Sequence, residues 1–277
     1  MPLIDMDHTV LHYTDRPADT SVERGVDIVL LHSFGTTARV WEPMLAMLDR
    51  RHRVVALDAR NHGRSGASTS SSLNDNVSDV TAVIGRLSLD RPVIVGSSVG
   101  ALVAVAVAAR APESVRAVVS VGGASHAPVT VPELAAAMTA MVEGLRTDPE
   151  STIKAVTPGW FGPLVGPRVH DWVAEQMREM RAEAIAIADD ALIADPRATL
   201  AALPVPVHHL HGALDPIPAA IARESAELSP LATITVLERV AHMPHIEMPG
   251  WFAGWLGDVV GAADDDHRLG SSRWARP

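Results

Sequence analysis

The sequence predicts an α/β fold, in which a mostly parallel β-sheet is flanked by helices and carries an all-helical insertion between two strands. Short apolar, β-branched runs of strand length alternate with longer runs of helical periodicity. Such alternation is typical of parallel sheets with helices on both faces. Between about 124 and 203, by contrast, no strand-like run occurs, and amphipathic helical patterns are interrupted by prolines.

The expected elements follow from hydrophobic periodicity. Strands are expected at Thr9–Tyr13, Asp27–Leu31, Arg53–Leu57, Val93–Val95, Val115–Val121, Val205–Leu210 and Thr233–Leu237. Helices are expected at Ala38–Leu48, Asn74–Leu87, Ala101–Arg110, Ile217–Leu228 and Pro249–Val260.

These elements predict a core of residues 1–123 and 204–260, with residues 124–203 as a helical cap (lid). We expect the cap to lie over the carboxyl ends of the strands, where open parallel sheets bind ligands. Residues 261–277, which include the acidic run Asp264–Asp266, are predicted to form a disordered tail.

Composition excludes several classes of function. The 277 residues carry a formal net charge of −10 and no basic run, which argues against a nucleic-acid partner. The absence of cysteine excludes disulfides, thiolate catalysis and cysteine-ligated zinc. With 47% hydrophobic and 20% charged residues, the chain has the composition of a soluble globular protein.

The longest uncharged stretch, Val93–Ala109, is too short for the roughly 20 residues of a membrane span, and small residues interrupt it. We therefore expect no membrane partner. The first residues lack the basic and apolar regions of a signal peptide, which predicts a cytoplasmic protein. The sequence leaves open whether the chain forms a homo-oligomer.

The stretch Pro92–Arg110 joins a strand, the motif Gly96-Ser97-Ser98-Val99-Gly100 and a helix of small residues. In this context Gly-x-Ser-x-Gly indicates a nucleophile elbow, a sharp turn that presents the serine hydroxyl at the N-terminus of a helix. The turn predicts a strained backbone at Ser98 and no room for side chains at the two glycines. Taken alone, the motif is also compatible with a Gly/Ser turn whose hydroxyl only caps the helix. Whether Ser98 is a nucleophile therefore depends on finding its partner residues elsewhere in the sequence.

A serine nucleophile needs a base and an acid that orients the base. Ser98, Asp215 and His242 each follow a predicted strand, so we expect them to meet at one edge of the parallel sheet. His245 is a rival base, but the spacing from the strand favours His242. The other common location for the acid, after Val115–Val121, holds no carboxylate.

The order serine, acid, histidine is that of α/β-hydrolases, and the sequence resembles that superfamily over residues 9–260. The resemblance also rests on four segments: His32-Ser33-Phe34-Gly35, Asp58–Ser65, His211–Asp215, and Ala241–Pro244 with Glu247 and Pro249. It implies the α/β-hydrolase fold, a catalytic triad of Ser98, Asp215 and His242, and an oxyanion hole formed by the backbone N–H groups of Phe34 and Val99.

The sequence departs from the family pattern at Ser33, Asn61 and Ala241, where the family usually has glycine. Ser33 and the pair Val40-Trp41 resemble the sequence pattern of the 3-oxoadipate enol-lactonase/esterase-like branch. No catalytic group is lost at any of the three positions.

The resemblance implies an α/β-hydrolase enzyme, a serine hydrolase that cleaves a small carboxylic ester, lactone or enol-lactone through an acyl-enzyme intermediate, without a cofactor. The same triad also serves C–C bond hydrolases and cofactor-free perhydrolases, and slow-turnover small-molecule receptors or regulatory partners keep it as well. These alternatives stay open. Haloalkane dehalogenase chemistry is disfavoured, because it needs a carboxylate nucleophile where this chain has Ser98.

Large side chains of the cap are candidates for lining a substrate pocket, with burial in the interior of the cap as the competing interpretation. The candidate substrate-binding residues are Met138, Trp160, Phe161 and Trp172.

Five other histidines have alternative interpretations. His208, His209 and His211 have the appearance of a metal cluster, but on a strand only His209 and His211 share a face. Strand packing is therefore favoured, and no metal site is predicted. His32 and His62 occupy landmark positions of the family and are expected to be hydrogen-bonded scaffold rather than proton carriers.

Overall fold

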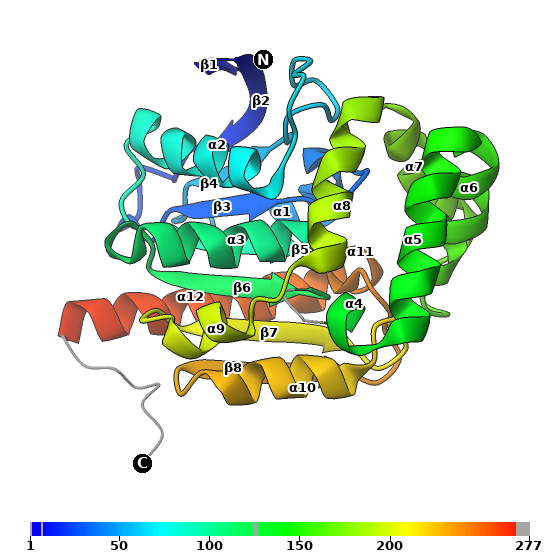
Figure 1. The fold of residues 1–277 in the computed structure, drawn as a ribbon. Coiled ribbons are helices and arrows are strands. Elements are labelled where there is room, and N and C mark those ends of the chain that lie inside the picture. Colours follow the sequence, from blue (N-terminus) through cyan, green and yellow to red (C-terminus); the bar gives the residue numbers. More distant parts are fainter. Residues whose placement is uncertain (1, 7, 124–126, 270–277) are drawn as a thin grey trace.

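An eight-stranded β-sheet forms the centre of the protein in this computed structural model, which describes residues 2–6, 8–123 and 127–269 (Figure 1). The strand order is β1-β2-β4-β3-β5-β6-β7-β8. The strands are β1 (Leu3–Met6), β2 (Thr9–Arg16), β3 (Ile28–Leu31), β4 (Val54–Leu57), β5 (Val93–Ser97), β6 (Ala117–Val121), β7 (Val207–Gly212) and β8 (Ala232–Leu237). From β4 to β8 all neighbours are parallel, and only the pairs β1–β2 and β2–β4 are antiparallel. The predicted fold class is confirmed.

The sequence did not predict β1, which pairs with β2 at the edge of the sheet. This strand has only four residues, and Leu3 is 58% exposed. Because an edge strand is covered on one side only, it lacks the continuous apolar run that marks the central strands.

Two apolar clusters cover the two faces of the sheet. Val29 and Leu31 pack with α2 (Leu73–Arg86) and α3 (Val99–Arg110). The alternate residues Ile28 and Leu30 pack with η1 (Ala38–Trp41), α1 (Glu42–Leu45) and α12 (Pro249–Leu269). Since successive side chains of a strand point to opposite faces, the apolar run of β3 serves both layers. The remaining core helices are η2 (Pro112–Ser114), α10 (Ala219–Leu228) and α11 (Pro244–Glu247).

Between β6 and β7 the described chain is helical. Its elements are α4 (Ala127–Thr130), α5 (Pro132–Thr147), α6 (Pro149–Val156), η3 (Thr157–Trp160), α7 (Pro167–Arg178), η4 (Ala182–Ala184), α8 (Ile185–Ile193) and α9 (Arg197–Ala202). Helices α5 to α8, called the inserted helices below, stand beyond the carboxyl ends of the parallel strands (Figure 1). Helix α9 lies instead against α3 and α10, on one face of the sheet.

Helix α12 is longer than predicted, and the disordered tail proposed from residue 261 is wrong for residues 261–269. The helix continues to Leu269. Val260 and Ala263 are buried, and Asp264 forms an ion pair with Arg116 at 3.5 Å, so the acidic run begins inside the helix. Residues 270–277 of the predicted tail lie outside the described residues.

The uncharged stretch that begins at Val93 is divided between β5 and α3. Among the described residues, no helix is long and apolar enough to cross a bilayer.

The turn between β5 and α3 leaves no room for side chains at its glycines. A Cβ at Gly96 would lie 2.2 Å from the carbonyl oxygen of Gly100, and a Cβ at Gly100 would lie 2.6 Å from the carbonyl oxygens of Leu31 and His32. Backbone contacts this close bring the start of α3 directly onto the end of β3.

We predict that Gly96→Ala lowers the free energy of unfolding by at least about 1–3 kcal/mol, because the added methyl group must displace backbone. Gly254→Ala is the matched control: it lies within α12 and faces open space, so it should raise stability by about 0.5–1 kcal/mol through helix propensity. Urea unfolding of both variants measures the difference. Wild-type stability of Gly96→Ala would contradict the close approach.

Candidate active site

Ser98 has a strained backbone at the start of α3. Its φ of 53° and ψ of −116° form a combination that residues with a side chain rarely adopt. The Ser98 N–H donates to the carbonyl of Val121 at 2.8 Å, and the Ser98 carbonyl accepts the N–H of Ala101 at 2.9 Å. The half-buried side chain lines a pocket at the carboxyl edge of the sheet.

His242 and Asp215 meet in the same pocket. The His242 Nδ1 lies 2.9 Å from Asp215 Oδ2, and Asp215 Oδ1 accepts the backbone N–H of Ile217 at 2.8 Å. The carboxylate of Asp215 is fully buried. Because an ionised carboxylate only accepts hydrogen bonds, the His242 proton sits on Nδ1 and Nε2 is left to act as a base. The structure therefore brings Ser98, Asp215 and His242 together.

The pKa of His242 is raised above its usual value. Burial alone would lower the pKa, but the charge of Asp215 and its hydrogen bond, with a smaller contribution from the charge of Glu247, outweigh this effect. The imidazolium that forms when His242 takes a proton is thereby stabilised.

His245, the rival base, lies elsewhere. It is fully buried, with its ring 4.3 Å from the ring of Trp41 between centroids. Burial lowers the pKa of His245 to about 3, so the ring stays neutral. The carboxylate of Asp215 contacts His242 instead.

The backbone N–H groups of Phe34 and Val99 have no hydrogen-bond partner among the described residues. Both residues line the pocket with Ser98. Gly35, with φ of +75°, turns the chain after Phe34, and the hydroxyl groups of Ser33 and Ser97 lie 2.8 Å apart. This arrangement fixes the loop His32–Thr37, called the oxyanion loop below after the role expected from the sequence, beside Ser98.

His32 and His62 support the oxyanion loop as neutral rings. Each Nε2 accepts a backbone N–H, from Ala59 to His32 at 2.9 Å and from Gly35 to His62 at 3.3 Å. Each Nδ1 donates to a backbone carbonyl. Burial lowers the pKa of both rings, that of His62 to about 3. These contacts agree with the scaffold role predicted from the sequence.

Asn61 stands where the family usually has glycine because the position has a positive φ of 63°. Asparagine tolerates this left-handed conformation better than most residues. Its side chain also exchanges two hydrogen bonds with the backbone of Ser68, at 2.9 and 2.8 Å. The substitution therefore preserves the turn.

Glu247 is a residue whose importance the sequence did not show beyond its place in the histidine motif. Its Oε1 accepts the N–H of Ala241 at 2.9 Å, and its Oε2 accepts the N–H of Gly162 at 2.8 Å. Beside it, the N–H of His242 donates to the carbonyl of Trp160 at 3.1 Å. Glu247 thus joins the loop that carries His242 to the inserted segment. Burial raises the pKa of this carboxyl.

The pocket around Ser98 encloses about 700 Å³ of empty space, part of it open to solvent, and carbon atoms form most of its wall. Its apolar lining includes Leu134, Met138, Met141, Trp160, Ala188 and Ile217. The titratable groups in the lining are Asp215 and His242, and no arginine or lysine of the described chain takes part.

Two of the four predicted lining residues are in the pocket wall. Met138 and Trp160 line it, with the Trp160 ring 6.5 Å from the ring of His242 between centroids. Phe161 and Trp172 do not, and their prediction is wrong. Phe161 has extended backbone, so it points away from Trp160, and it stacks on His170 at 5.1 Å. Trp172 packs against the apolar cluster on the α12 side of the sheet.

The three histidines of β7 are distributed over separate environments. His208 shares a hydrogen bond of 2.9 Å with the hydroxyl of Thr233, while His209 is buried. Burial lowers the pKa of His208 and His209 to about 4. The His211 Nε2 donates to the carbonyl of Ile217 at 2.8 Å, beside the loop of Asp215. Within the described ranges, no group of three histidine, aspartate or glutamate side chains could hold a metal ion.

A sequence profile described as "Alpha/beta hydrolase family" matches residues 28–255. The chain is 30% identical, over 82% of its own length and 91% of the relative, to the pimeloyl-[acyl-carrier protein] methyl ester esterase of Pectobacterium carotovorum. It is 24% identical to 3-oxoadipate enol-lactonase 2 of Acinetobacter baylyi, over 90% of both chains. A match to a protein of Mycobacterium phage D29 spans only 43% of this chain and 45% of that protein.

Among solved structures, the enol-lactonase from Burkholderia xenovorans superposes with a TM-score of 0.82 at 25% identity, covering 94% of this chain and 100% of that chain. The esterase from Exiguobacterium antarcticum superposes with a TM-score of 0.81 at 20% identity and covers 91% of this chain and 96% of that chain. The second likeness shows the fold alone.

We predict that Glu247→Gln shifts the pH dependence of Ser98 reactivity to lower pH. The base must be neutral to take the Ser98 proton, so reactivity rises as the pH passes the pKa of His242. Removing the negative charge of Glu247 lowers the pKa of His242. The rise in reactivity, which is the acid limb of the pH profile, therefore moves to lower pH. The rate of fluorophosphonate labelling as a function of pH measures the shift.

Glu238→Gln is the control, since it removes an exposed carboxylate from the same segment between β8 and α11. If Glu247 had a purely structural role, Glu247→Gln would reduce the labelling rate at all pH values without moving the acid limb of the pH profile.

Proposed function

The chain belongs to the alpha/beta hydrolase family and is a carboxylic-ester hydrolase, and we propose that it cleaves a small ester or lactone at Ser98 through an acyl-enzyme intermediate. The observation that carries the proposal is the convergence of three groups on one pocket: a strained serine at a helix N-terminus, a histidine and a buried carboxylate hydrogen-bonded to that histidine.

In the proposed mechanism, His242 Nε2 takes the proton of the Ser98 hydroxyl while Oγ attacks the carbonyl carbon of the substrate. The negative charge that develops on the carbonyl oxygen is met by the N–H groups of Phe34 and Val99. The tetrahedral intermediate then collapses, and His242 gives its proton to the departing alcohol oxygen. Water repeats the sequence on the acyl-enzyme and releases the acid, while Asp215 holds the imidazole in place.

The wall of the pocket supports an uncharged substrate. Most of its side chains are apolar, and the described part of the chain places no arginine or lysine there to meet a free carboxylate. The similar proteins include a methyl ester esterase and enol-lactonases, and esters and enol-lactones present the same kind of carbonyl carbon to a nucleophile. We favour a small neutral ester or lactone over one with a free carboxylate, such as 3-oxoadipate enol-lactone.

We further propose that the inserted helices act as a cap over this pocket. Met138 and Met141 of α5 and Ala188 of α8 form part of its wall, so the cap shapes the space that a substrate occupies. The cytoplasmic location stays a prediction of the sequence.

We predict that Ser98→Ala lowers kcat for p-nitrophenyl esters by about 10³-fold or more while leaving the fold intact, because the nucleophile is removed but the pocket is not. Steady-state kinetics and fluorophosphonate labelling measure the loss. Ser78→Ala, an exposed serine of α2, is the control and should react as the wild type does. Undiminished turnover by Ser98→Ala would refute the assignment of the nucleophile.

Turnover of different substrates separates the alternatives that share the triad. Turnover of p-nitrophenyl esters or enol-lactones supports the assignment as an ester or lactone hydrolase. Turnover of meta-cleavage products alone would instead indicate a C–C bond hydrolase, and peroxyacid formation alone would indicate a perhydrolase. Labelling of Ser98 with a single turnover on every substrate would indicate a receptor.

A further inference from the structure

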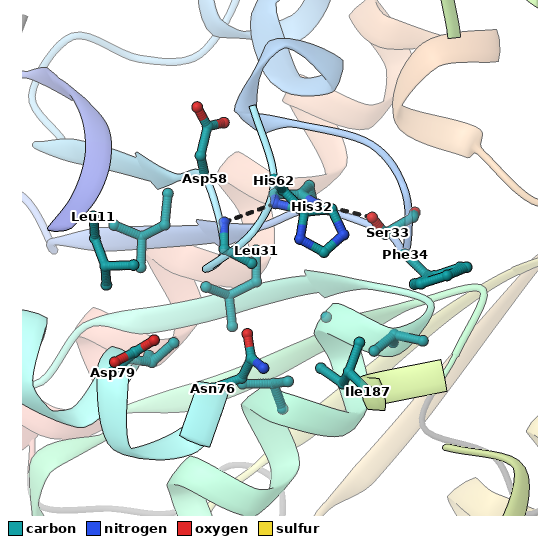
Figure 2. Close-up of a pocket in the computed structure, with 16 residues that line it drawn as sticks. Leu11, Leu31, His32, Ser33, Phe34, Asp58, His62, Asn76, Asp79 and Ile187 are labelled. Carbon is teal, nitrogen blue, oxygen red and sulfur yellow. Dashed lines mark hydrogen bonds between the residues drawn. The ribbon is translucent and has the colours of Figure 1, made fainter. Parts of the chain in front are cut away.

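A second cavity lies beside the oxyanion loop, which contributes His32, Ser33 and Phe34 to its wall (Figure 2). It holds about 480 Å³ of empty space, part of it open to solvent, between the ends of β3 and β4 and helices α2, α3 and α8. Ser33, Phe34 and Val99 line both this cavity and the catalytic pocket. The two residues whose N–H groups face the proposed oxyanion therefore stand between the two spaces.

The wall of the second cavity suits an uncharged apolar group. Leu31, Val80, Val103 and Ile187 contribute to it, and most of the wall is carbon. His62, the ring at its edge, is held neutral because burial lowers its pKa to about 3.

The acidic groups of the wall are already engaged in the structure. Asp58 accepts the N–H groups of Ala38 and Arg64, at 2.7 and 3.0 Å. Asp79 forms two hydrogen bonds of 2.8 Å with Arg60. A further carboxylate in this cavity would lose its hydration without meeting a cation in the wall.

Phe34 separates the two spaces. Its ring packs edge-on against His62, with centroids 6.3 Å apart and planes at 81°. Figure 2 shows Phe34 at one end of the cavity and Leu11 at the other. On α8, the consecutive residues Ile187 and Ala188 line the second cavity and the catalytic pocket respectively, so one helix covers both.

We propose that the second cavity is the site for the acyl chain of the substrate, and that it takes a neutral, unbranched chain which passes Phe34 and ends between Val80, Val103 and Ile187. The inference rests on the proposed function, because it needs an acyl group bound at Ser98. Phe34 then has two roles: its backbone N–H donates to the oxyanion, and its ring controls how far the acyl chain extends.

The test is the ratio of kcat/KM for p-nitrophenyl hexanoate to that for p-nitrophenyl acetate. In the wild type this ratio should exceed one, since each buried CH₂ contributes about 0.8 kcal/mol, or about fourfold in kcat/KM. Ile187→Phe fills the cavity from α8 and Val80→Phe fills it from α2, and each should lower the ratio by about tenfold. Ile193→Phe adds the same ring at the exposed end of α8 and should leave the ratio unchanged.

The charge of the chain end gives a second readout. The mono-p-nitrophenyl ester of adipic acid has six carbons, as the hexanoate does, but ends in a carboxylate. We expect its kcat/KM to be at least about tenfold lower than that of the hexanoate, because its carboxylate would be buried without a cation to pair with. Equal values would overturn the requirement for a neutral chain.

The outcomes separate the two proposals. If the wild type cleaves esters but Ile187→Phe and Val80→Phe, shown to be folded by circular dichroism and by Ser98 labelling, keep the wild-type ratio, the acyl-chain site is wrong and the proposed function stands. If one variant does not fold, the other decides. If the wild type cleaves no ester, the proposed function fails and the acyl-chain site fails with it.

Discussion

The close approach of the first turn of α3 to the ends of β3 and β5 is the constraint on which the site depends. Gly100 lies against the carbonyl oxygens of Leu31 and His32, and no side chain fits between them. Because the oxyanion loop begins at His32, the same contact sets the distance between that loop and Ser98. The proposed nucleophile and both predicted oxyanion donors are therefore positioned by backbone, which moves less than side chains do.

The Asp215 carboxylate distinguishes His242 from the other buried histidines at this edge of the sheet. His32, His62 and His245 are buried without a carboxylate hydrogen-bonded to the ring, and desolvation lowers the pKa of each. His242 is equally buried, but the Asp215 carboxylate reverses the direction of the shift. One buried charge thus distinguishes His242 from three neighbouring rings, of which His32 and His62 serve as fixed hydrogen-bond partners.

The parts of the structure that follow from short local patterns could be predicted from the sequence. The strands β3, β4 and β5 begin as continuous apolar runs, and Ser98, Asp215 and His242 each follow a predicted strand, so the parallel sheet and the meeting of these residues were predictable. The edge strand β1 and the end of α12 depend on pairing with β2 and on burial of Ala263, and no local pattern shows either contact. The same holds for the lining of the pocket: whether Phe161 or Trp160 faces Ser98 depends on the direction of an extended backbone.

The inserted helices are attached to the core at the loops that form the site. Gln176 of α7 accepts hydrogen bonds from the N–H and hydroxyl of Thr37, and Asp190 of α8 accepts the N–H of Leu73 at the start of α2. Glu247 adds its bond to Gly162 beside the histidine loop. A displacement of the inserted helices would therefore act on the oxyanion loop, on one wall of the second cavity and on His242 together. The elements proposed to select the substrate and those proposed to hold the catalytic groups are therefore joined by hydrogen bonds, so a change of substrate preference by mutation of the inserted helices should carry a change in the reactivity of Ser98.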